Sequence, residues 1–185
     1  RVRRFQSPLG SRNRGHRGNM QPTSIEQPTV EKLRLVRSLR RSEPFCSKYF
    51  DFQDAYKCLF ALVDGNQIET SLYVHSYRGK VVDVAVDIAT MAGCPIGCQF
   101  CAATVGRYVR PLNADEILSQ FIQITEEFNP PAYPKLIAAF QGIGEPSLLA
   151  TEVTSVSSII RGLDRRNVIS ISTTGAHLEG IYLWR

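Results

Sequence analysis

The sequence predicts an α/β protein whose sheet is at least partly parallel. Three short apolar segments rich in β-branched residues, 81–89, 136–140 and 168–172, alternate with two stretches of helical periodicity. The order strand, helix, strand, helix, strand is typical of parallel strands joined by right-handed crossovers. With 185 residues, 43% of them hydrophobic, the chain has enough apolar material for one domain core.

The first residues, 1–28, are predicted to form a disordered basic tail. Six arginines precede the first acidic residue, Glu26, and no apolar periodicity accompanies them. A segment of this composition cannot bury enough apolar surface to offset the entropy of ordering it. Met20 stands where the composition changes, so we interpret the residues before it as upstream sequence or a fragment boundary.

Residues 29–58 are assigned as a helical N-terminal segment. Leu33, Val36 and Leu39 recur at helical spacing, and arginines gather on another face of the expected helix. Such a basic helix can lie along phosphates, although a solvated helix face is the simpler interpretation.

The main domain, residues 59–185, is expected to begin with a β-hairpin. Asp64 and Gly65 separate two apolar segments and suit a tight turn with positive φ. A second turn at 77–80 leads into the strand at 81–89. This strand continues directly into a cysteine-rich segment.

Two crossover helices follow in the expected order. Asn113, with Glu116 three residues later, is predicted to cap the first helix, Asp115 is assigned to the same cap, and the prolines at 130–131 are expected to end the helix. A second helix is expected over 151–163. Three parallel strands cannot close a barrel and leave an unpaired edge, so the domain is interpreted as truncated after about three strands.

Composition excludes several classes of protein. No apolar run is long enough to cross a bilayer, no secretory signal is visible, and five cysteines without regular spacing do not make a disulfide framework. The net charge of +5 is uneven: residues 1–48 hold 12 Lys and Arg against three acidic residues, net +9, and residues 49–185 hold 10 against 14, net −4. Basicity therefore belongs to the front of the chain.

The segment most informative about chemistry is the cysteine motif. Cys94, Cys98 and Cys101 follow C-x3-C-x2-C spacing, and neighbouring Gly and Pro predict a tight loop after a strand. Three thiolates on one loop suit a soft metal centre. Zinc with a fourth, remote ligand, an iron–sulfur cluster with one open iron, and three inert buried thiols all remain possible from spacing alone. A remote ligand would come from Cys46, Cys58, His75 or His177, and the two histidines are more simply explained as ordinary surface or strand-end residues.

This motif, with Phe100 before its last cysteine, resembles the cluster motif of radical S-adenosylmethionine (SAM) enzymes. Further blocks occur in the order of one branch, the adenine-2-methyltransferases of ribosomal RNA and tRNA: LVDGNQIETSLY, AGCPIGCQFCAATVGRYVRPLNADEILSQ, FQGIGEPSLLA and ISISTTGAHLEGI. The resemblance spans roughly residues 59–180. It implies the first half of that family's catalytic domain, a partial (β/α) radical SAM barrel.

The resemblance implies roles for particular residues. The three cysteines of the motif correspond to the ligands of a 4Fe-4S cluster, whose open iron binds SAM. Gly144 and Glu145, within Gly142–Pro146, correspond to a segment that contacts the SAM amino group. Ser172, at the start of 172–175, corresponds to a serine that contacts SAM. Glycine and serine turns of this kind are common in any chain, so these assignments depend on their register with the cysteines.

One position departs from the family. Asp87 stands seven residues before the first motif cysteine, where the family has a cysteine that resolves a covalent RNA adduct. The family's second cysteine, which carries the methyl group, is expected beyond Arg185. A carboxylate accepts a proton or hydrogen bond but cannot replace a thiol in breaking a thioether. Arg110 also matches a family arginine, with no role assigned.

We therefore expect a cytoplasmic radical SAM enzyme related to RNA adenine methyltransferases, with a 4Fe-4S cluster and SAM as cofactors. RNA as substrate and a flavodoxin-like electron donor follow from the same resemblance. No membrane partner is expected, because no apolar run is long enough to cross a bilayer. Two alternatives stay open. One is a diverged radical SAM enzyme acting on another substrate, which Asp87 favours; the other is a zinc-binding RNA-interaction module without catalysis.

Overall fold

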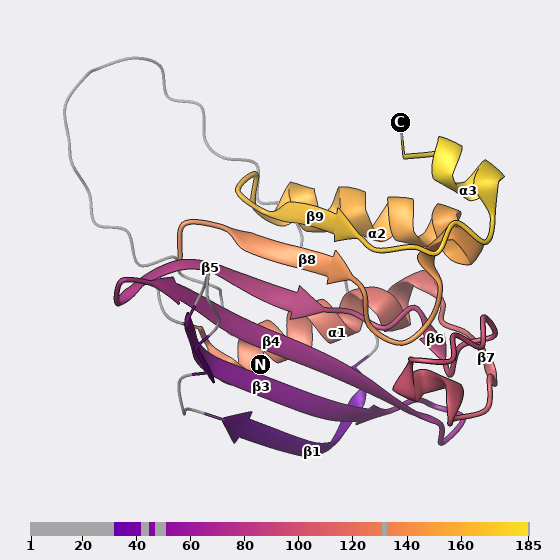
Figure 1. Ribbon diagram of the computed structural model, residues 1–185, viewed down its shortest axis with the longest axis horizontal. Coiled ribbons are helices and arrows are strands. Elements are labelled where there is room, and N and C mark those ends of the chain that lie inside the picture. Colours follow the sequence, from indigo (N-terminus) through magenta and orange to yellow (C-terminus); the bar gives the residue numbers. More distant parts are fainter. Residues whose placement is uncertain (1–31, 42–44, 47–50, 131–132, 185) are drawn as a thin grey trace.

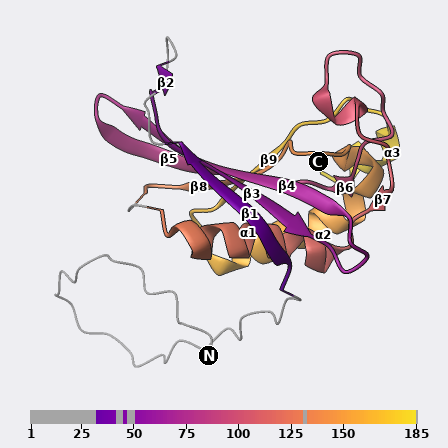
Figure 2. The same ribbon diagram turned by 90° about the horizontal axis from the view of Figure 1, so that it is seen from below.

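A computed structural model describes residues 32–41, 45–46, 51–130 and 133–184. They form one mixed sheet with helices packed on one of its faces (Figure 1, Figure 2). The strand order is β1-β3-β4-β5-β8-β9, with β2 pairing β3, and β6 and β7 form a separate pair. The elements are β1 (Arg34–Arg41), β2 (Phe45–Cys46), β3 (Asp51–Ala61), β4 (Gln67–Tyr77), β5 (Lys80–Asp87), β6 (Met91–Ala92), η1 (Ala102–Thr104), β7 (Arg110–Pro111), α1 (Ala114–Phe128), β8 (Leu136–Phe140), η2 (Pro146–Leu149), α2 (Ala150–Leu163), β9 (Val168–Ile171) and α3 (Leu178–Tyr182).

Strands β3, β4 and β5 form an antiparallel meander with two tight turns. The first turn has Gly65 at φ +84°, and the Asp64 carboxylate accepts a hydrogen bond from the backbone N–H of Asn66 at 3.0 Å. The second turn places Arg78 and Gly79 at φ +51° and +74°. Both turns lie where the sequence predicts them, because Asp-Gly and Arg-Gly place a glycine where positive φ is needed.

Strands β5, β8 and β9 are parallel, and α1 and α2 connect them. This confirms the α/β class and the predicted order of strands and helices. The outer side of β5 is not bare, because β4 pairs with it in antiparallel fashion. Among the strands that the structure describes, β9 ends the sheet at one side and β1 at the other.

One continuous core lies between the sheet and its helices. Both faces that meet there are apolar, and they contribute fully or almost fully buried side chains, including Phe60, Leu72, Val86, Phe140, Ile117, Phe121, Val156 and Ile160. Gln120 of α1 is fully buried in this core, where its amide bonds both the N–H and C=O of Ala89 at 2.9 Å. α1 is thereby fixed to the chain leaving β5. None of the helices in the described part of the chain is long and apolar enough to cross a membrane.

The helix expected over 29–41, and the helical assignment of 29–58, are wrong for the residues described. Residues 34–41 are strand β1, paired antiparallel with β3, and residues 51–58 already belong to β3. Every residue of β1 is exposed. The apolar residues that recur at helical spacing in the sequence therefore do not form the buried face of a helix. Pairing with β3 satisfies its backbone instead, and arginines are well suited to an exposed edge strand. The expected disordered tail at 1–28 lies outside the described residues.

Candidate functional site

The three motif cysteines lie on a loop that leaves and returns to the sheet at one narrow neck. β6 and β7 pair antiparallel through Ala92 and Arg110, and the Val109 N–H donates to the Ala92 carbonyl at 2.9 Å. Gly93 has φ +75°, and a Cβ there would lie 2.2 Å from the Arg107 carbonyl oxygen. Only glycine therefore fits where the loop begins.

The loop itself exposes its thiols. Cys94 and Cys98 are half-buried and Cys101 is exposed. Gly97 has φ +72°, and the Cys101 N–H donates to the Cys98 carbonyl at 3.0 Å, which makes the tight loop predicted from the sequence. Within the described residues, no three Cys, His, Asp or Glu side chains are grouped closely enough to hold a metal ion. The thiols thus share an accessible loop without forming a preassembled ligand set.

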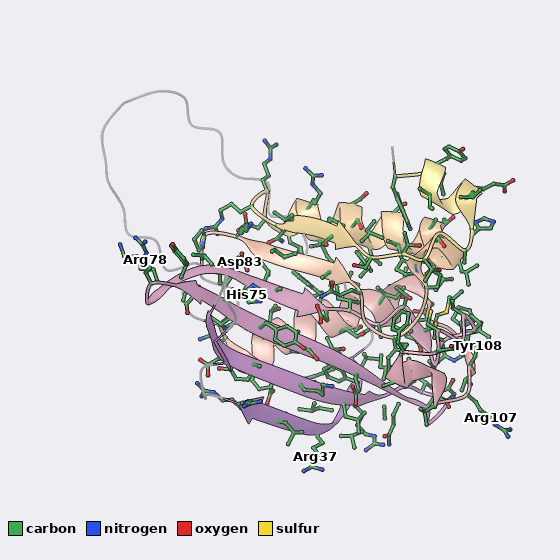
Figure 3. All side chains as sticks on the ribbon, in the orientation of Figure 1. Arg37, His75, Arg78, Asp83, Arg107 and Tyr108 are labelled. Carbon is green, nitrogen blue, oxygen red and sulfur yellow. The ribbon has the colours of Figure 1, made fainter. Side chains whose placement is uncertain are left out.

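The described residues that were considered as a fourth metal ligand make contacts elsewhere in the fold. Cys58 faces the core with no exposed area, and burial raises the pKa of its thiol to about 11. His75 lies on the helix-free face of the sheet, with Nδ1 2.5 Å from the Asp83 carboxylate (Figure 3). His177 caps α3, its Nδ1 accepting from the Gly180 N–H at 3.1 Å. The side chain of Cys46 lies outside the described part of the chain.

Arg110 fastens the far end of the cysteine loop. Its guanidinium makes two bonds of 2.8 Å to the Glu116 carboxylate and one of 2.5 Å to Asp64 in the hairpin turn. Glu116 also accepts from the Asn113 N–H at 3.0 Å and completes the predicted capping box. Hydrogen bonds from Arg110 and Asn66 lower the pKa of Asp64 to about 2. One side chain therefore joins the loop, the hairpin and the start of α1.

The Gly142–Pro146 segment follows β8 and packs against the chain leaving β5. The Thr90 N–H donates to the Ile143 carbonyl at 2.8 Å, and the Gly142 N–H donates to the Ile88 carbonyl at 3.1 Å. Gly144 has φ +119°, and a Cβ there would lie 2.3 Å from Thr90 Oγ1 and 2.9 Å from the Met91 nitrogen. The Thr90 hydroxyl oxygen is buried without a hydrogen-bond partner. The glycines therefore allow this segment to approach the stem of the cysteine loop.

Glu145 is buried, and its carboxylate is fully used within the protein. It accepts from the Ser147 N–H at 3.0 Å, the Thr174 N–H at 2.9 Å, the Thr174 hydroxyl at 2.8 Å and the Thr173 hydroxyl. Burial acts against ionisation, but these hydrogen bonds outweigh it and lower the pKa of Glu145 to about 2. The carboxylate thus ties the loop after β8 to the loop after β9. Its predicted contact with SAM stays a prediction.

A second hydrogen-bonded chain crosses the carboxyl ends of the three parallel strands. Gln141 follows β8, donates to Asp87 at the end of β5 at 2.7 Å, and accepts from the Ser172 hydroxyl at 3.4 Å. Burial raises the pKa of Asp87, although the Gln141 hydrogen bond opposes the shift. Gln141 was missed from the sequence. The rule that ligands gather after parallel strands could have indicated it, because it directly follows β8.

The predicted residues therefore gather at one end of the sheet. Asp87, Gly144, Glu145 and Ser172 follow or end β5, β8 and β9, where α/β sheets bind ligands. The cysteine loop extends from the same end, at the right of Figure 3, where Arg107 and Tyr108 project from it. Thr173 and Thr174, the partners of Glu145, were not singled out because their role depends on a residue 28 or 29 positions away.

Comparisons with known proteins identify similar chains. A probable dual-specificity RNA methyltransferase RlmN from Caldicellulosiruptor saccharolyticus is 32% identical over 165 residues, covering 87% of this chain and 44% of the relative. A dual-specificity RNA methyltransferase RlmN from Campylobacter fetus is 33% identical over 137 residues, covering 66% of this chain and 39% of the relative. No protein-family model matches the chain. The resemblance stated from the motifs is thereby confirmed, and the chain spans less than half the length of these curated relatives.

The fold is also found among solved structures. A radical SAM methyltransferase from Sphaerobacter thermophilus superposes with a TM-score of 0.56 and 24% identity, over 77% of this chain and 39% of that one. The similarity confirms the expected α/β fold.

Proposed function

We propose that this chain is the cofactor-binding part of a radical SAM enzyme that methylates RNA. The relatives are RNA methyltransferases by name, and the solved neighbour shares the fold. The observation that carries the proposal is the packing of the cysteine-loop stem against the Gly142–Pro146 segment at the carboxyl ends of the parallel strands.

The donor set fits an iron–sulfur cluster. Cys94, Cys98 and Cys101 provide three soft ligands on one accessible loop, and a cluster held by three thiolates keeps one iron open. When bound, the cluster supplies one electron for reductive cleavage of SAM. The neck of the loop is held by the β6–β7 pair, so the three thiols reach the cluster from one fixed stem.

The protein's own residues position the cofactors. Arg110 holds the exit of the cysteine loop on the hairpin and α1, and the Gly144 backbone lies beside the entry stem. The Ser172 hydroxyl and the backbone around Gly144 are the proposed SAM contacts. Glu145 positions the loops after β8 and β9 through its hydrogen bonds, and its predicted contact with the SAM amino group is part of the proposal.

RNA as substrate, a flavodoxin-like electron donor and a cytoplasmic location belong to the same proposal. They rest on the named relatives and on the one-electron chemistry of the cofactor. A reductase of low potential must supply that electron.

A second candidate is a diverged radical SAM enzyme acting on a substrate other than RNA. Asp87 favours it, because its carboxylate ends β5 and bonds Gln141 where the family has a thiol. Methylated adenine in RNA from cells that express the full-length protein, and its loss on gene deletion, would exclude this candidate.

Anaerobic reconstitution with iron and sulfide tests the proposal. The wild-type chain should gain cluster absorbance and, with dithionite and SAM, release methionine and 5′-deoxyadenosine. The triple variant C94A/C98A/C101A should lose both signals. C58A is the matched control, since Cys58 lies in the core. A cluster retained by the triple variant, or one equivalent of zinc without iron in anaerobically purified protein, contradicts the proposal.

A further inference from the structure

The face of the sheet without helices has a continuous row of side chains from its edge to Asp87. Residues paired across neighbouring strands share a face of the sheet. Leu39 of β1 pairs with Lys57, Lys57 with Ser71, and Ser71 with Asp87. The row crosses three inter-strand spacings, which amounts to about 14 Å.

The arginines of β1 divide between the two faces. Arg40 pairs with Tyr56 on the core side, lies 5.2 Å from its ring centroid and bonds Asp54 at 3.1 Å. Arg34, Arg37 and Arg41 pair with residues of the other face, because a bulge between Leu35 and Arg37 shifts the register. Figure 3 shows Arg37 projecting from this edge of the sheet.

The three arginines on the helix-free face carry uncompensated charge. Each is exposed, and none forms an ion pair within the described ranges. Two acidic residues of the same face already have partners: Glu69 bonds Lys57 at 2.8 Å, and Asp83 bonds His75. The third, Asp87, stands at the far end of the row and accepts a hydrogen bond from Gln141. Arg37 and Arg41 stand two residues to either side of Leu39, so they flank the row that leads to Asp87.

We propose that this helix-free face binds a single-stranded segment of the RNA substrate. Arg34, Arg37 and Arg41 hold backbone phosphates at the edge, and the row from Leu39 guides a base toward Asp87. Tyr73 lies in the adjacent row, paired with Ala85, and its ring stacks on that of His75 with the centroids 6.4 Å apart. The inference rests on the proposed function for the identity of the ligand. The charge and register of β1 are independent of it.

RNA affinity of the full chain, measured without cluster or SAM, tests the inference. Fluorescence anisotropy follows a labelled single-stranded RNA of about 20 nucleotides, longer than a typical single-strand footprint. R37Q/R41Q should weaken binding on the order of tenfold at low salt, and should lower the slope of log affinity against log salt by about 1.4, as expected for two lost phosphate contacts. The matched control is R161Q/R165Q, which removes the same charge from exposed positions in and after α2.

Each result of the binding experiment either supports or overturns the proposed RNA-binding face. Loss confined to R37Q/R41Q supports the face; equal loss in both variants overturns it, because only total charge would then matter. Unchanged RNA affinity with new self-association of R37Q/R41Q also overturns it, since the arginines would then only protect an edge strand. Single-stranded DNA that binds as tightly, with the same variant effect, overturns RNA as the ligand.

Failure of this inference can be told from failure of the proposed function. R37Q/R41Q should keep wild-type cluster absorbance and SAM cleavage, because β1 is remote in sequence from the cysteine loop. Normal cleavage with unchanged RNA affinity rejects only the binding face. Absence of a cluster in the wild-type chain rejects the proposed function, whatever the RNA result.

Discussion

At the scale of single residues, Glu145 and Asp87 show how a carboxylate's surroundings decide its role. Both lie at the carboxyl ends of the parallel strands. Glu145 accepts four hydrogen bonds, and Asp87 accepts one from Gln141 while burial disfavours its charge. One carboxylate is therefore held ionised by the protein, and the other has less support for its charge.

Replacing Glu145 should reveal this role through pH. E145Q leaves buried donors unpaired, which should cost roughly 2 kcal/mol or more of the free energy of unfolding at pH 7. A lowered pKa means that the wild-type stabilisation is present above the usual value near 4.5 and is lost as pH falls toward about 2. Denaturant unfolding at several pH values measures both effects. A stability difference that stays constant down to pH 2 would contradict the role.

The contribution of Asp87 to stability should depend on pH in the opposite direction from that of Glu145. Its pKa is raised, so the folded state gains stability from this group at low pH and loses it as pH rises through the folded pKa. D87N keeps an acceptor for Gln141 and removes the half-buried charge. Its melting temperature should exceed that of wild type at pH 7, and the gain should shrink as pH falls through the raised pKa of Asp87 toward the usual value of 3.8. A D87N variant less stable than wild type at neutral pH would show that the charge itself is stabilising.

At the scale of elements, Arg110 makes the cysteine loop part of the scaffold. R110Q removes the bonds to Glu116 and Asp64, and should cost about 1 kcal/mol because the pair is partly exposed. It should also speed proteolytic cleavage within residues 93–109. R107Q is the control, because Arg107 is an exposed residue of the same loop. Equal cleavage rates in both variants would contradict the proposal that Arg110 holds the cysteine loop on the scaffold.

Local signals in the sequence were enough to predict some elements. The turn at Asp64 and Gly65 and the capping box at Asn113 and Glu116 depend on neighbouring residues, and the structure confirms them. β1 could not be predicted this way, because its conformation comes from pairing with residues more than ten positions away. Thr173 and Thr174 could not be predicted as partners of Glu145 for the same reason, because they lie far from it in the sequence.

The cysteines illustrate a different limit. Their spacing predicts one loop, which the structure confirms, and motif register predicts that the Gly142–Pro146 segment lies nearby. Whether the thiols converge depends on the ligand they bind, which neither spacing nor apolar pattern encodes.

At the scale of the whole molecule, the described strands form a sheet whose central strands have a neighbour on each side and whose two outer strands have one. β4 has strands on either side, whereas β1 and β9 each have one neighbour among the described strands. Hydrogen exchange should therefore be slowest in 67–87 and much faster in 34–41 and 168–171. Mass spectrometry of peptides from the native chain measures this. Exchange in β1 as slow as in β4 would mean that another part of the protein covers that edge.

The antiparallel meander also has a consequence for how the chain reaches its fold. β3, β4 and β5 are consecutive and joined by tight turns, so their pairing closes only short loops and forms quickly. The parallel pairing of β8 with β5 must wait for a crossover through α1. During synthesis the meander leaves the ribosome before β8 and β9 and offers β5 as a template. The β3–β4–β5 meander would then act as the folding nucleus on which β8 and β9 assemble.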